Sequence, residues 1–165
     1  MTADERKTLI AQYADGYRAV AEALVGATDE DLDARPAPGK WTAREVVHHL
    51  ADSEMTGAAR LRLLVAIDRP QILGYDQDQF AGRLFYDRPI AASLDAFKAA
   101  RRATAEILER MSDADWARPA GTHTEHGPYD AERWLTIYAR HAHAHAEQIL
   151  VARGSAKDQS NRGAR

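Results

Sequence analysis

Apolar side chains recur at helical spacing in four segments of the chain. In residues 4–25 they follow one another at intervals of one, three or four positions: Leu9, Ile10, Tyr13, Tyr17, Val20 and Leu24. This spacing places them on one face of an amphipathic helix. Similar stripes predict helices over residues 42–67, 91–111 and 129–152, and no segment has a convincing strand pattern. We therefore predict an all-α fold, a four-helix bundle.

The connections between these helices are polar and rich in proline and glycine. Thr42 and Glu45 have the spacing of a capping box at the start of the second helix. Residues 70–89 lack a clean period, and we expect this long connection to pack near one end of the bundle and limit access to its interior. A second long connection follows the third helix. The pattern predicts a single domain over residues 1–153, with a disordered polar tail over residues 154–165.

Composition and charge narrow the class of protein. The net charge of the 165 residues is -3, and Lys and Arg are dispersed among acidic residues, so no basic surface for nucleic acid is expected. The absence of cysteine excludes disulfides, thiolate ligands and a cysteine nucleophile, and fits a reducing compartment. The first ten residues, MTADERKTLI, carry charge where a signal peptide needs an apolar core, so we expect no leader, and no apolar run approaches the roughly 20 residues of a membrane span. We expect a cytoplasmic protein that acts on a small molecule and binds neither nucleic acid nor membranes.

Three of the seven histidines stand at alternate positions in the last predicted helix. Each helical residue turns by about 100°, so His141 and His145 lie one turn apart on the same side. Their apolar neighbours place that side toward the bundle interior, and we expect His143 to face water. An inward pair at this spacing can bind one divalent ion. Two core histidines hydrogen-bonded to the backbone or to Tyr138 would have the same pattern.

The second helix offers two adjacent histidines as a third ligand. His49 shares its face with the apolar Val46 and Leu50, whereas His48 lies on the more polar face of Arg44. We therefore predict that His49 is the ligand and that His48 is a surface or rim residue. Three histidines with an open fourth position are typical of catalytic zinc-type sites.

A di-iron site is the competing chemistry for a bundle of this kind. Glu45 and His48 form the Glu-x-x-His element that such sites use. The last helix has no second element of this type, and Glu22 of the first helix lies among solvent-facing positions. The sequence therefore favours the three-histidine site.

Four other polar residues could either contribute to the site or have an ordinary structural role. Asp52 and Glu45 could orient His49 as hydrogen-bond acceptors. They would otherwise be part of a solvated helix face and a capping group. His123 and His126 precede the last helix and could reach the open side of the site, although loop histidines are more often solvated.

Three stretches resemble the DinB-like superfamily of metal-binding four-helix bundles: GKWTAREVVHHLADSE, YDQDQF and IYARHAHAHAEQI. The resemblance covers roughly residues 36–149 and is most specific around Trp41 and the histidines. It implies one divalent ion bound by His49, His141 and His145, with zinc or nickel expected first and iron or manganese as alternatives. It also implies a homodimer.

Within this superfamily, RPAPGKWTAREVVHHLADSE and GYDQDQF look closest to the bacillithiol S-transferase branch. The last helix departs from that branch at Arg140, Ala144 and Gln148. The branch uses a low-molecular-weight thiol as co-substrate, and a metal-bound thiol is deprotonated. We therefore expect a metal-dependent enzyme that transfers a bacillithiol-type thiol to an electrophilic small molecule. The alternatives are a metal-dependent hydrolase that uses metal-bound water and a non-catalytic metal-binding stress protein.

Overall fold

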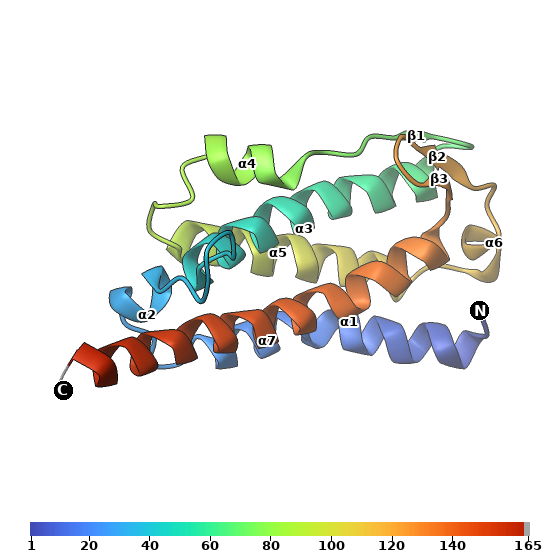
Figure 1. The fold of residues 1–165 in the computed structure, drawn as a ribbon. Helices are drawn as coiled ribbons and strands as arrows, with labels where there is room; N and C mark the ends of the chain where they lie inside the picture. The colour runs from blue at the N-terminus through green and yellow to red at the C-terminus, as the bar shows by residue number, and fades with distance from the viewer. Residues whose placement is uncertain (164–165) are drawn as a thin grey trace.

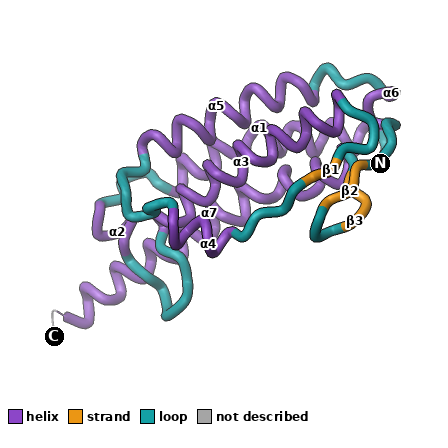
Figure 2. Tube along the Cα trace, turned by 90° about the horizontal axis from the view of Figure 1, so that it is seen from above, coloured by secondary structure: helices purple, strands orange, loops and turns teal. Residues whose placement is uncertain are grey.

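In the part of the chain that the structure describes, four long helices form the body of the protein and lie side by side along one direction (Figure 1, Figure 2). The computed structural model describes residues 1–163, and the side chains of residues 1–154. The long helices are α1 (Ala3–Ala23), α3 (Ala43–Ala66), α5 (Ala91–Leu108) and α7 (Ala131–Gly163). Short helices in the connections are α2 (Asp29–Asp33), α4 (Gln77–Arg83) and α6 (Asp113–Trp116). The predicted all-α four-helix bundle with long connections is confirmed.

The ends of the helices follow local sequence signals. Thr42 caps α3, because its side chain accepts from the backbone N–H of Glu45 at 3.2 Å and the Glu45 carboxylate accepts from the Thr42 N–H at 2.8 Å. The last helix runs beyond its predicted end near residue 152 and reaches Gly163. Most of the 154–165 tail lies outside the residues with described side chains, so its disorder stays a prediction. Within the described part of the chain, no helix combines the length and the apolar character that a membrane span requires.

The expectation that the chain has no strands is wrong at one end of the bundle (Figure 1). There, β1 (Gln71–Ile72) pairs in parallel with β2 (Gly121–His123), which pairs antiparallel with β3 (Gly127–Tyr129). Strands of two or three residues are too short to show an alternating pattern. A Cβ on Gly121 would lie 2.5 Å from the carbonyl oxygen of Pro70, so the pairing of β1 with β2 requires glycine.

We expected the 70–89 connection to pack near one end of the bundle, and this expectation is wrong. It begins at the small sheet, and its helix α4 then lies alongside α3 (Figure 1). The ring of Tyr75 contacts that of Phe80, with centroids 4.5 Å apart. Further along, the buried Tyr86 donates its hydroxyl hydrogen to Oδ2 of Asp52 at 2.7 Å. The hydrogen bond from Tyr86 to Asp52 holds this part of the connection against α3.

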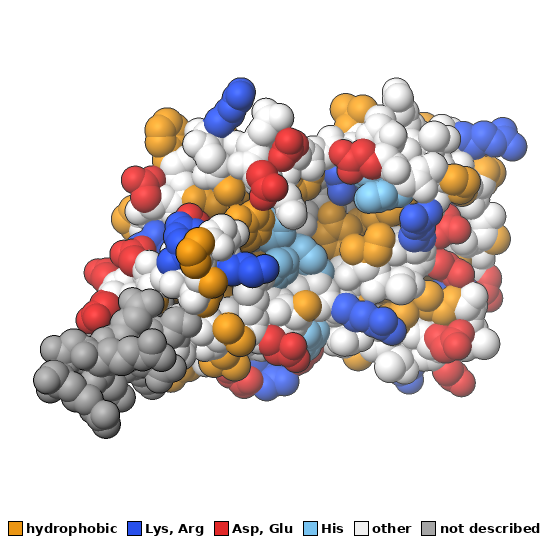
Figure 3. Space-filling view, viewed as in Figure 1, with side chains coloured by type: hydrophobic (Ala, Val, Ile, Leu, Met, Phe, Trp, Pro, Cys, Tyr) orange, Lys and Arg blue, Asp and Glu red, His pale blue; other side chains and the backbone are white. Residues whose placement is uncertain are grey.

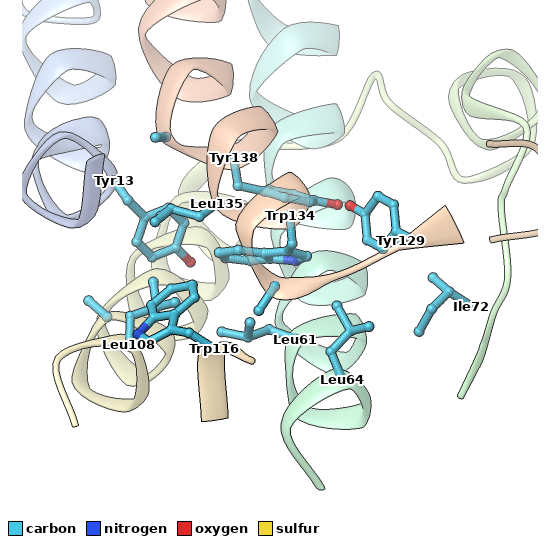
Figure 4. Close-up of a cluster of buried hydrophobic side chains, with 13 residues drawn as sticks. Tyr13, Leu61, Leu64, Ile72, Leu108, Trp116, Tyr129, Trp134, Leu135 and Tyr138 are labelled. Carbon is cyan, nitrogen blue, oxygen red and sulfur yellow. The ribbon is translucent and has the colours of Figure 1, made fainter. Parts of the chain in front are cut away.

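The interior of the bundle contains two apolar clusters. The first surrounds Trp134 and includes Tyr13 and Tyr138 (Figure 4). The indole N–H of Trp134 donates to the carbonyl oxygen of Gly57 at 2.8 Å. A Cβ on Gly57 would overlap the ring of Tyr138, so glycine is needed for this close approach of α3 and α7. The second cluster surrounds Phe97 and lies toward α2.

A buried ion pair lies between these clusters. The carboxylate of Glu54 is 3.4 Å from Nε of Arg101, and their side chains are only 1% and 2% exposed. The hydroxyl of Tyr13 donates to the same carboxylate. Arg101 also donates to the carbonyl oxygens of Tyr13 at 3.2 Å and Tyr138 at 2.9 Å. This network joins α1, α3, α5 and α7 next to the histidines.

Candidate metal centre

The structure brings His49 of α3 together with His141 and His145 of α7. Nε2 of His141 lies 3.4 Å from Nε2 of His49 and 3.1 Å from Nε2 of His145. Two ligand nitrogens at tetrahedral angles, each about 2.0–2.1 Å from one zinc ion, would be about 3.3 Å apart. The observed separations therefore fit three imidazoles that share one ion.

The alternating histidines of α7 divide between two sides of the helix. His141 and His145 lie one turn apart, with ring centroids separated by 4.5 Å, and they face the ring of His49. The expectation that His143 faces water is wrong. It is half-buried against α1, where its Nε2–H donates to the carbonyl oxygen of Gln12 at 3.0 Å. The side of α7 opposite the site is covered by another helix, so solvent does not reach it freely.

Burial keeps the three clustered imidazoles in the form that binds metal. Desolvation, with a smaller contribution from His145, lowers the pKa of His49 to about 3. Desolvation and the two neighbouring imidazoles lower the pKa of His141 to about 2. Burial also lowers the pKa of His145. All three are neutral near pH 7 and can present a nitrogen lone pair to a cation.

The rings differ in what orients them. Nδ1–H of His145 donates to Oε1 of Gln148 at 2.8 Å, which leaves Nε2 with its lone pair toward the cluster. Nδ1 of His49 is buried and has no hydrogen-bond partner among the described residues, and its ring packs against Trp41. The proposed acceptor Asp52 is instead buried and accepts from Tyr86.

The prediction that His48 is a surface or rim residue is also wrong. His48 is 0% exposed, its Nε2–H donates to the carbonyl oxygen of Arg88 at 3.0 Å, and its Nδ1 accepts from the hydroxyl of Ser93 at 2.8 Å. The connection that leads into α5 covers this face of α3. His48 therefore contributes to packing, apart from the three-histidine cluster.

A cavity of about 420 Å³ extends from His49 and His141 toward the small sheet. Figure 3 shows histidine side chains at the bottom of a hollow in the middle of this face. The described polar side chains that line the cavity include Ser53, Arg60, Tyr75, His123, His126 and Tyr138. The two loop histidines thus do reach the open side of the site. Our sequence reasoning missed Arg60, because the cavity forms only when the 70–76 segment packs against α3.

His123, Glu125 and His126 form a second cluster of ligand-type side chains, within 4.8 Å of one another. The rings of the two histidines are stacked, with an interplanar angle of 18° and centroids 4.6 Å apart. An ion must lie near the plane of each imidazole that binds it. Planes that are almost parallel meet far outside bonding distance, so this cluster does not offer convergent ligands.

The comparisons with known proteins identify the family. The family model of the DinB superfamily matches residues 12–149, and the chain belongs to this superfamily. YfiT from Bacillus subtilis has a solved structure that superposes with a TM-score of 0.84, at 23% identity, over 97% of this chain and 90% of that one. It is described as a probable metal-dependent hydrolase with an unusual four-helix bundle topology. The superfamily that the sequence resembles is therefore confirmed.

Curated relatives carry names that imply a metal. A protein from Oceanobacillus iheyensis is 32% identical over 140 residues, which are 85% of this chain and 81% of that protein. A protein from Geobacillus thermodenitrificans is 30% identical over 155 residues, 92% of this chain and 85% of that protein. Each is named "Putative metal-dependent hydrolase". The names agree with the candidate histidine site and specify no particular metal.

Proposed function

We propose that this protein is a metal-dependent enzyme in which His49, His141 and His145 hold one divalent ion at the inner end of the cavity. The separations of 3.1 and 3.4 Å between their Nε2 atoms carry the proposal, because they match three ligands of one ion. An ion there would lower the pKa of a thiol or water and so supply a nucleophile near neutral pH. Zinc and nickel are the metals we propose first.

The reaction we favour is transfer of a low-molecular-weight thiol, of the bacillithiol type, to an electrophilic small molecule. No carboxylate of the described residues belongs to the cluster of three histidines, and a metal-activated thiol needs no separate base. The chain has no cysteine, so the thiol must come from a co-substrate. Burial raises the pKa of the cavity residues Tyr75 and Tyr138. Their phenols stay protonated and can donate hydrogen bonds to charge that develops on the electrophile.

Hydrolysis is the second candidate function, and the names of the relatives favour it. It would use the same three histidines and the same cavity, with water in place of the thiol. The cytoplasmic location and the homodimer are predictions on which neither reaction depends.

An activity assay separates these reactions. Protein purified without a His tag is loaded with zinc or nickel and offered bromobimane with and without a small thiol, and a nitrophenyl ester in water. We expect thiol-dependent conjugation that disappears in His141→Ala and after chelation, and that persists in the control His143→Ala. Thiol-independent ester cleavage with the same dependence on His141 would establish the hydrolase instead. Absence of both reactions, from protein shown to contain the metal, would contradict an enzymatic role with these reactants.

A further inference from the structure

We infer that the small molecule bound in this cavity carries a carboxylate, and that Arg60 of α3 binds that group. The inference rests on the proposed function, because it assigns a class of ligand to the same cavity. Arg60 is half-buried and lines the cavity together with His49 and His141. Among the described residues, no carboxylate oxygen lies within 4.0 Å of its guanidinium nitrogens.

Arg60 differs in this respect from Arg44 and Arg101, the two buried arginines among the described residues. Arg44 pairs with Asp33 at 2.6 Å, and the fully buried Arg101 pairs with Glu54. Arg60 instead donates from Nε and Nη2 to the carbonyl oxygen of Leu73, at 3.1 and 2.5 Å. A carbonyl oxygen satisfies hydrogen bonds but carries no net charge. The positive charge of Arg60 therefore has no internal counter-ion in the cavity.

The remaining donors of Arg60 suit a planar anion. A guanidinium has five N–H donors. Two of them meet the carbonyl of Leu73, and one on Nη1 is directed at the hydroxyl of Tyr138, 3.4 Å away. One donor on each Nη atom is left, and such a pair can bind both oxygens of a carboxylate. The ring of Tyr75, 5.7 Å from the guanidinium carbon, packs beneath the group and limits its movement.

The other groups of the cavity agree with an anionic ligand. Nδ1 of His123 accepts from the backbone N–H of Glu125 at 3.1 Å, so the neutral ring carries its proton on Nε2 and can donate it. Two carboxylates also line the cavity. That of Asp76 is occupied by the N–H groups at the start of α4, and that of Glu125 is exposed at the rim. Neither neutralises Arg60.

Tyr138 separates Arg60 from the three histidines. Its ring centroid is 5.9 Å from that of His141, while its hydroxyl faces Arg60. A ligand that reaches both places must extend past this ring. The reactive end of the molecule would then lie at the histidines, with its carboxylate several atoms away at Arg60.

Matched ligands test this inference. The probes are mercaptoalkanoic acids of increasing chain length and their primary amides, which differ only in the charged group. Dissociation constants are measured by calorimetry on zinc-loaded wild type, Arg60→Gln and Arg60→Lys. For at least one chain length we expect the acid to bind the wild type about tenfold more tightly than the amide. The preference should vanish in Arg60→Gln and persist in part in Arg60→Lys.

A second measurement does not depend on the metal. In metal-free wild type, the side-chain N–H resonance of Arg60, assigned by its loss in Arg60→Lys, should shift with butyrate and not with butyramide. The shift with butyrate would support the inference even if the protein bound no metal and had no activity. Failure to bind metal or to turn over would overturn the proposed function alone. Equal affinity of every acid and amide pair for the wild type, or no shift with butyrate, would overturn the inference whatever the outcome for the metal.

Discussion

Acid should destabilise the metal-free protein through the histidines of the site. The pKa of His49 is lowered to about 3 and that of His141 to about 2, whereas an exposed histidine in the unfolded chain titrates near 6.5. Below about pH 6.5 the unfolded state therefore binds more protons than the native state, and stability falls as the pH falls. The contribution of the two neutral histidines to the free energy of unfolding is fully present above the pKa of the unfolded chain. It is lost progressively as the pH falls toward the pKa values of the native protein.

The size of the effect follows from these values. Between about pH 7.5 and about pH 5.5, each of the two histidines removes about 1.4 kcal/mol, or about 2.7 kcal/mol together, because neither protonates in the native state in this range. The assay is urea unfolding, followed by circular dichroism in the presence of a chelator, at both pH values. Other groups also titrate, so the informative quantity is the difference between the wild type and the double variant His49→Gln, His141→Gln.

The wild type should lose about 2.7 kcal/mol more than this double variant over the same interval. His143→Gln is the matched control on the other side of α7, and we expect it to retain the full loss. If the wild type and the double variant lose the same free energy of unfolding, the two rings do not remain neutral and buried in the native protein, and our account of the site is wrong.

Three further predictions concern the core and the metal. Glu54→Gln leaves the buried Arg101 without its charge partner and should cost about 3–5 kcal/mol in urea unfolding; a loss below about 1 kcal/mol would contradict the buried pair. Gly57→Ala places a methyl group against the ring of Tyr138 and should cost about 1–3 kcal/mol, whereas an unchanged midpoint would show that α3 and α7 can move apart freely. Chelation should lower the melting temperature, since an ion present at about 1,000 times its dissociation constant contributes about 4 kcal/mol. An unchanged melting curve after proven metal loss would contradict a site that joins α3 to α7.

The helices could be predicted from the sequence because their signals are local. The stripe of Tyr13 and Val20 and the capping box of Thr42 and Glu45 need no tertiary information. The small sheet could not be predicted, because its strands are set by contacts between segments about fifty residues apart, such as Gln71 with Thr122. The packing of the bundle sets which residues of these short strands pair.

The candidate site could likewise be predicted in part, where it depends on helical geometry. Helical geometry placed His141 and His145 on one side of α7 and selected His49 over His48, and the structure brings these three together. Geometry alone misplaced His48, because the segment that covers it, including Arg88, has no periodic pattern. The cavity depends on similar non-local contacts between the 70–76 segment and α3, which a helical projection cannot supply.

Metal content of single variants tests the central claim most directly. Wild type, His48→Ala, His49→Ala and His141→Ala are purified without a tag or added metal, and the folded protein is analysed for bound metals. We predict about one divalent ion per chain in the wild type and in His48→Ala, and loss of most of it in the other two, because two histidines bind an ion far more weakly than three. Retention of the ion in His49→Ala or His141→Ala, or equal loss in His48→Ala and His49→Ala, would contradict a centre built from His49, His141 and His145.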